Sequence, residues 1–88
     1  MYTSDKHILK LIDLLLFQKQ ISSTKDFCQE IGILEQTISK IKNGKNHFTV
    51  QHIETICKKY HVNANWIFGI DNQIFTNIKS NQKSVQTT

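Results

Sequence analysis

The residues best suited to polar recognition lie between positions 35 and 45, where charged and uncharged polar side chains recur at helical spacing. Four of them carry groups that match the donors and acceptors on the edges of DNA base pairs: Glu35, Gln36, Ser39 and Lys40. Residues 40 to 47 also hold three lysines and no acidic residue, and this positive charge suits phosphate groups. The segment therefore has side chains for contacts with both the bases and the backbone of duplex DNA.

Two short helices with a tight turn between them would position these side chains. Ser23 is placed to cap the first helix, and Gly32 ends it because glycine readily adopts the left-handed conformation past a helix terminus. The second helix begins around Glu35 and ends at Asn43, which another glycine follows. Apolar residues at helical spacing form the two inward faces: Phe27, Cys28, Ile31, Ile38 and Ile41. This pattern predicts a helix-turn-helix from about Thr24 to Asn43, whose second helix would enter the major groove.

The segment before this unit predicts a helix from Ser4 to about Lys19, capped by Ser4 or Asp5. Apolar residues cover it nearly all round: Ile8, Leu9, Leu11, Ile12, Leu14, Leu15, Leu16 and Phe17. A helix with so wide an apolar surface has to bury a second face, against the C-terminal segment or another subunit.

Two more helices are predicted after the polar loop formed by residues 45 to 48. Thr49 is the expected cap of the fourth helix. Its inward face contains Val50, Ile53, Ile56, Cys57 and Tyr60. A short fifth helix covers Ala64 to about Phe68, with Asn63 as its cap and Trp66 as its large buried anchor.

The composition favours one small helical domain with an acidic partner. The 88 residues are 39% apolar and contain no proline, which favours helices over a turn-rich β architecture. The net charge of +4 suits nucleic acid, although many small proteins are mildly basic. All eleven basic residues are lysines, so the bidentate contact between arginine and guanine is not available.

Cys28 and Cys57 fall inside apolar helical patterns, which indicates buried, unpaired thiols in a reducing cytoplasm. The apolar run at residues 14–17 is far too short to span a bilayer, so we expect a cytoplasmic protein that does not contact membranes. Cys57 and His61, near His52, could form half of a metal site, but a second pair of ligands is missing. We expect no metal and no cofactor. No arrangement of catalytic residues occurs, so we also expect no enzyme activity.

The sequence resembles the Cro and phage-repressor type of helix-turn-helix regulators, also described as XRE-like. The matching residues run Phe27-Cys28-x-x-Ile31-Gly32-Ile33-x-x-x-Thr37-Ile38-Ser39-Lys40-Ile41-x-Asn43-Gly44-Lys45. A later segment, Val62-Asn63-x-Asn65-Trp66-Ile67-Phe68, resembles the C-terminal end of repressor-like members. The resemblance extends from about Ile8 to Phe75.

The resemblance implies an all-α, lambda-repressor-like DNA-binding domain of five helices, with the helix-turn-helix at the second and third. It implies base-edge contacts from residues of the third helix: Glu35, Gln36 and Lys40, with Ser39 close by. It implies phosphate contacts from Thr24, Asn43 and Lys45, to which the lysine-rich composition of this region adds Lys42.

Three residues depart from the family pattern. Thr24 stands where members often have glutamine, which weakens the expected backbone contact. Leu34 replaces the usual serine or threonine cap of the third helix, a change that costs such a helix about 1 kcal/mol unless another group substitutes. Glu35 replaces a neutral residue, and it either accepts from a cytosine amino group or favours the helix N-terminus and repels phosphate. Gln36 suits adenine, and Lys40 can donate to guanine acceptors.

We expect sequence-specific binding to double-stranded DNA as a homodimer that acts as a repressor. Apolar residues near the C-terminal end, together with the spare face of the first helix, motivate the dimer: Ile70, Ile74, Phe75 and Ile78. The domain would span residues 1–70, and residues 71–88 would be a tail that is partly disordered or contacts the dimer partner. The alternative function is a protein-interaction module, such as an antitoxin subunit or adaptor, in which the polar face of the third helix is only solvent-exposed.

Overall fold

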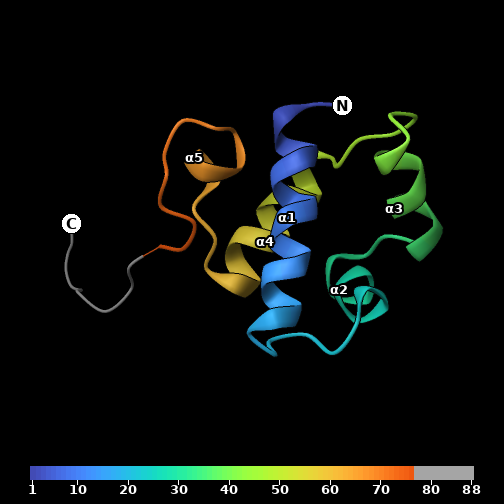
Figure 1. Cartoon of the computed structure of the whole chain (residues 1–88), viewed down its shortest axis with the longest axis horizontal. Coiled ribbons are helices and arrows are strands. Elements are labelled where there is room, and N and C mark those ends of the chain that lie inside the picture. Colours follow the sequence, from blue (N-terminus) through green and yellow to red (C-terminus); the bar gives the residue numbers. More distant parts are fainter. Residues whose placement is uncertain (77–88) are drawn as a thin grey trace.

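The computed structural model describes residues 1–76 and shows the predicted all-helical fold in that range (Figure 1). Its helices are α1 (Thr3–Phe17), α2 (Thr24–Ile31), α3 (Glu35–Lys42), α4 (Val50–Tyr60) and α5 (Ala64–Ile67). In Figure 1, α1 runs through the middle of the molecule, with α2 and α3 on one side and α5 on the other. The helix-turn-helix and the C-terminal helix therefore lie on opposite sides of α1.

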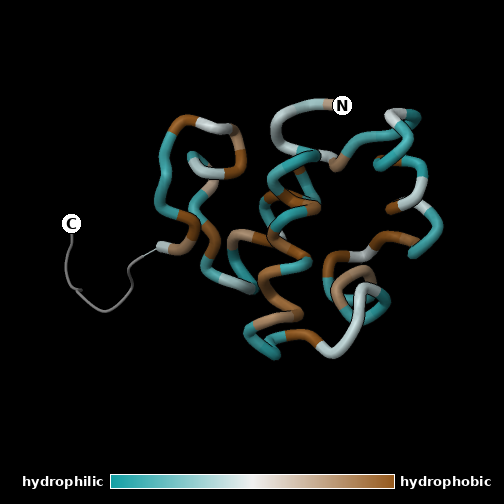
Figure 2. The backbone as a smooth tube through the Cα atoms, viewed as in Figure 1, coloured by the Kyte–Doolittle hydropathy of each residue, from teal (hydrophilic) through white to brown (hydrophobic). Residues whose placement is uncertain are grey.

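The core is a single cluster of apolar side chains from every helix. Fifteen buried residues form it: Ile8, Leu11, Ile12, Leu15, Ile21, Phe27, Cys28, Ile31, Ile38, Ile41, Phe48, Ile53, Ile56, Val62 and Ile67. Figure 2 shows hydrophobic stretches on the inner sides of the helices and hydrophilic stretches on the outer side of α3. The predicted inward faces of α2 and α3 are confirmed, since all five of their members are buried.

Three of the predicted helix caps are confirmed. The Ser23 hydroxyl accepts from the Asp26 N–H at 3.1 Å, and the Thr49 hydroxyl accepts from the His52 N–H at 3.2 Å. The side-chain oxygen of Asn63 accepts from a backbone N–H of α5 at 3.0 Å. These caps satisfy N–H groups that have no partner inside their own helices.

The predicted cap of α1 was wrong. The N-cap is Tyr2, and both Ser4 and Asp5 lie within the first turn of α1, where they are buried. Asp5 instead reaches back from the first turn to accept from the Tyr2 N–H at 3.0 Å. Its carboxyl group is completely buried, because it also binds a loop that is distant in the sequence.

Two predictions of buried residues also need correction. Val50, the first residue of α4, is 80% exposed. Trp66 is only half-buried against the core, and the fully buried residue of α5 is its neighbour Ile67. Helical spacing predicts the side of a helix on which a residue lies but not where the covering segments end.

The chain after α5 folds back onto the segment before it. Val62 and Phe75 form an antiparallel bridge, in which the Asn63 N–H donates to the Ile74 carbonyl oxygen at 2.7 Å. Ile74 and Phe75 pack against the core and are half-buried, whereas Ile70 is 75% exposed. Residues 77–88 lie outside the described range, so the predictions for Ile78 and for the tail remain predictions.

Candidate nucleic-acid interface

A tight turn at Gly32 sets the angle between α2 and α3. Gly32 adopts a left-handed conformation with φ +79°, which a residue with a side chain rarely adopts. The N–H groups of Gly32 and Ile33 both donate to the Cys28 carbonyl oxygen, at 2.9 and 3.0 Å. Cys28 is buried where the two helices meet, and Ile33 is half-buried. The turn thus directs α3 away from α2 within three residues.

The outward face of α3 holds the residues predicted to contact bases. Because successive residues of an α-helix differ by about 100°, the residues at positions 35, 36, 39, 40 and 43 share an arc of roughly 140°. Ile38 and Ile41 lie on the opposite side and are buried. All four predicted base-contacting residues are exposed: Glu35, Gln36, Ser39 and Lys40. The helix therefore presents one continuous polar surface to solvent.

Hydrogen bonds at the C-terminal end of α3 fix the backbone of the residues that are predicted to contact phosphate. Asn43 is the C-cap, and Gly44 follows it in a left-handed conformation with φ +76°. The Lys45 N–H then donates to the Lys40 carbonyl oxygen at 2.8 Å, which satisfies a carbonyl group at the helix terminus. Lys45 lies just after the C-terminal end of α3 and is exposed.

A cleft of about 170 Å³ separates α3 from α1 and the start of α2. Thr24, which is half-buried, and Lys42 line it from α2 and α3. Leu9, Ile12 and Ile38 provide apolar lining, and Lys10 and Asp13 contribute charged groups from α1. The structure thus brings two predicted phosphate contacts together and places Lys10 beside them. The sequence interpretation missed Lys10, although its spacing from the buried residues of α1 indicated an exposed position.

The lysines of α3 differ from those of α4 in their partners. On α4, Lys58 pairs with Glu54 at 3.6 Å and Lys59 with Glu30 at 2.9 Å. Among residues 1–76, no acidic side chain pairs with the three lysines at and after the C-terminal end of α3: Lys40, Lys42 and Lys45. Their charge is therefore available to an external anion.

The start of α3 has no side-chain cap. Leu34 occupies the N-cap position, its side chain accepts no hydrogen bond, and it is 66% exposed. Glu35 lies in the first turn, where a carboxylate interacts favourably with the N-terminal end of the helix dipole. Burial, and after it the Glu35 carboxylate, raises the pKa of the Cys28 thiol. Cys28 is thus a poor nucleophile at neutral pH.

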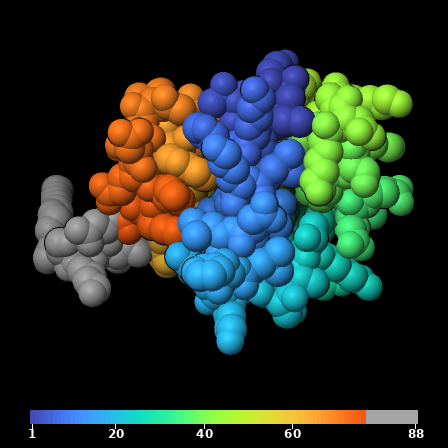
Figure 3. All heavy atoms as spheres, viewed as in Figure 1, coloured from blue at the N-terminus to red at the C-terminus, as the bar shows by residue number. Residues whose placement is uncertain are grey.

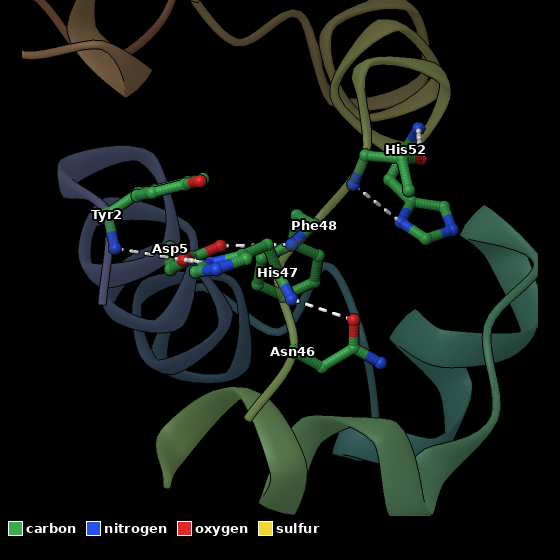
Figure 4. A network of polar contacts seen from close by, with 7 residues as sticks. Tyr2, Asp5, Asn46, His47, Phe48 and His52 are labelled. Carbon is green, nitrogen blue, oxygen red and sulfur yellow. Dashed lines mark hydrogen bonds and ion pairs between the residues drawn. The ribbon is translucent and has the colours of Figure 1, made fainter. Parts of the chain in front are cut away.

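A buried carboxylate joins the loop after α3 to the first turn of α1 (Figure 4). Asp5 accepts from the Phe48 N–H at 2.9 Å and contacts His47 Nδ1 at 2.7 Å. The ring of Tyr2 stacks on His47, with centroids 3.8 Å apart. Burial acts to raise the pKa of Asp5, but the hydrogen bonds from His47, Phe48 and Tyr2 outweigh it and hold that pKa below its ordinary value.

The sequence interpretation missed this connection, which we call the Asp5 clamp: Tyr2, Asp5, His47 and Phe48. The signal was present, because Asp5 shares a helix face with Ile8 and Ile12, and a carboxylate on an inward face requires partners. The partners could not be identified, since they lie more than 40 residues away in a polar loop.

Comparison with known proteins identifies one family. A model of the Cro/C1-type helix-turn-helix DNA-binding domain matches residues 11–64, which include α2, the turn and α3. No curated protein and no solved structure matches the chain. Within residues 1–76, no helix has the length and apolar character needed to cross a membrane, and no three potential metal ligands form a group.

Proposed function

The chain belongs to the Cro/C1-type helix-turn-helix family of DNA-binding regulators, and we propose that it is a repressor that binds a two-fold DNA site as a homodimer. In this proposal α3 lies in the major groove. The observation that carries it is the exposed polar face of α3, which lies opposite the buried Ile38 and Ile41 and has lysines without an acidic partner among residues 1–76.

Base recognition would come from the first two turns of α3, which enter the groove first. Gln36 can form two hydrogen bonds with adenine, and Lys40 can donate to the acceptors of guanine. Ser39 lies between them on the same face and can bond to either kind of group. Glu35 would accept from a cytosine amino group, or act only on the helix terminus, and the two roles predict different base preferences.

Backbone contacts would surround this face. Thr24 and Lys42 share the cleft between α1 and α3, so one phosphate group could contact both. Asn43 and Lys45 follow Lys42 at the C-terminal end of α3 and would contact a neighbouring phosphate. Lys10 is added to this set, because it lines the same cleft as Lys42. Such contacts set orientation and affinity, whereas base contacts set sequence preference.

The side of the molecule opposite α3 favours self-association. Figure 3 shows α5 and the following residues at one edge and α3 with its loop at the other. Phe68 and Ile70 are 50% and 75% exposed there. A dimer formed through this edge would place its two α3 helices on the outer sides of the two protomers, where each could enter a separate major groove.

Repression would follow from occupation of the site. A dimer that covers two successive major grooves competes for the same DNA with any other protein that must contact it. This proposal needs no bound effector, and the affinity for the operator alone would set the degree of repression.

Selection from a random duplex library, followed by titration of the selected duplex at two salt concentrations, tests the function. We expect enrichment of a two-fold motif and an affinity at least about 1,000-fold above that for a scrambled duplex. Weak binding that is sensitive to salt but indifferent to sequence would contradict the proposal. Sedimentation that shows a monomer both free and on DNA would contradict the homodimer alone.

A further inference from the structure

Leu34 violates two local preferences at once. An N-cap position favours a side chain that accepts a hydrogen bond, and α2, α4 and α5 all have one. Leu34 accepts none, and its apolar side chain is 66% exposed instead of joining the core. Natural sequences concentrate such violations at functional sites, where another interaction compensates for them.

The position of Leu34 limits what that interaction can be. Leu34 lies at the end of α3 that leads into the groove, directly before Glu35 and Gln36. The preceding residue, Ile33, is half-buried against the core and anchors the turn. In the major groove, the apolar group that a base edge presents is the C5-methyl group of thymine. An aliphatic side chain at this point of the helix therefore has one matching chemical partner on DNA.

We propose that Leu34 is a specificity-determining residue that contacts the C5-methyl group of a thymine in each half-site. This inference rests on the proposed function, because it requires α3 in the major groove. The turn before α3 would then supply a preference for thymine that the polar residues of α3 do not supply. Leu34 and Gln36 together would favour a half-site in which a thymine methyl lies beside an adenine.

Replacement of thymine by deoxyuridine tests the contact, since it removes the methyl group and keeps every hydrogen-bonding group of the base. Each thymine of the selected half-site is replaced in turn, and the dissociation constant is measured by titration. For one position we expect about a fourfold loss of affinity, the value for transfer of one methyl group out of water, and about fifteenfold when both half-sites are changed. The same replacement of thymine by deoxyuridine should not change the affinity of the Leu34→Ala variant for the duplex.

Two further variants serve as controls. Leu34→Met keeps an apolar side chain and should retain most of the deoxyuridine effect. Val50→Ala removes another exposed aliphatic side chain, outside α2 and α3, and should retain all of it. Because Leu34 is exposed, Leu34→Ala is expected to fold, and circular dichroism verifies this before titration.

The outcomes separate this inference from the function on which it rests. If selection yields no preferred sequence, the proposed function fails. If a preferred sequence is found and no thymine shows a methyl effect, or if the effect persists in Leu34→Ala, the inference about Leu34 is overturned while the function stands.

Discussion

Replacement of Asp5 by asparagine should lower the stability of the whole domain. Asp5 is completely buried and accepts three hydrogen bonds, from the N–H groups of Tyr2 and Phe48 and from the ring of His47. A hydrogen bond to a charged group contributes about 1.5–3 kcal/mol. The amide oxygen of asparagine can keep one side of this network, but its NH2 group then faces an N–H donor on the other side.

We therefore expect Asp5→Asn to lower the free energy of unfolding by about 3 kcal/mol. A domain of this size loses about 4–8 °C of melting temperature per kcal/mol, so Tm should fall by about 12–24 °C. Urea unfolding followed by circular dichroism measures the first quantity and a thermal scan the second. Asp13→Asn is the matched control, because Asp13 lies exposed on the same helix and its replacement should change stability by less than about 0.5 kcal/mol.

A double-mutant cycle locates the effect. If the Asp5 clamp acts through the loop after α3, Asp5→Asn and His47→Ala should be non-additive by about 0.5–3 kcal/mol. An Asp5→Asn protein as stable as the wild type would refute the reasoning that this carboxylate holds the loop against α1. Additive effects of the two substitutions would assign the lost stability to the other partners of Asp5.

Four further results are expected. Folding lowers the pKa of Asp5, so its contribution to the free energy of unfolding is complete above about pH 4, the ordinary range of an aspartate. This contribution is lost as the pH falls through the lower pKa of the folded state, and urea unfolding of Asp5→Asn should not show that loss. Gln36→Ala should lose about 1–3 kcal/mol of discrimination at one base pair, and a uniform loss across duplexes would contradict base reading. Lys45→Gln should flatten the salt dependence of DNA binding by about one unit per protomer, whereas Lys58→Gln, at a lysine paired on α4, should leave it unchanged. Leu34→Ser supplies the missing cap and should raise the free energy of unfolding by about 1 kcal/mol in urea, and no gain would mean that another group already satisfies the start of α3.

The parts of the fold that depend on short-range interactions were predictable. Ser23, Gly32, Thr49 and Asn63 act on backbone groups within a few residues, so their types alone indicated the helix boundaries. The buried faces of α2 and α3 followed from helical spacing for the same reason. Likewise, the exposed polar side of α3 followed from the position of its apolar residues.

The remaining features depend on contacts between distant residues. Ser4 or Asp5 was predicted as the cap of α1, but the partners His47 and Phe48 hold Asp5 in the interior. The fold-back of Ile74 and Phe75 depends on backbone bonds to the segment before α5, which no side-chain pattern records. The roles predicted for α3 in DNA binding remain predictions, because recognition depends on a duplex as well as on the exposed residues.

The weak anchoring of α3 has a consequence for the free protein. Two buried side chains hold this helix, whereas six residues of α1 are buried. Amide hydrogens of α3 should then exchange with solvent through local opening, while those of α1 exchange only when the whole domain unfolds. A cognate duplex would order the helix and slow that exchange. The cost of ordering α3 would lower the affinity for correct and incorrect sites by the same factor, so a substitution that orders α3 in the free protein should strengthen DNA binding without changing sequence preference.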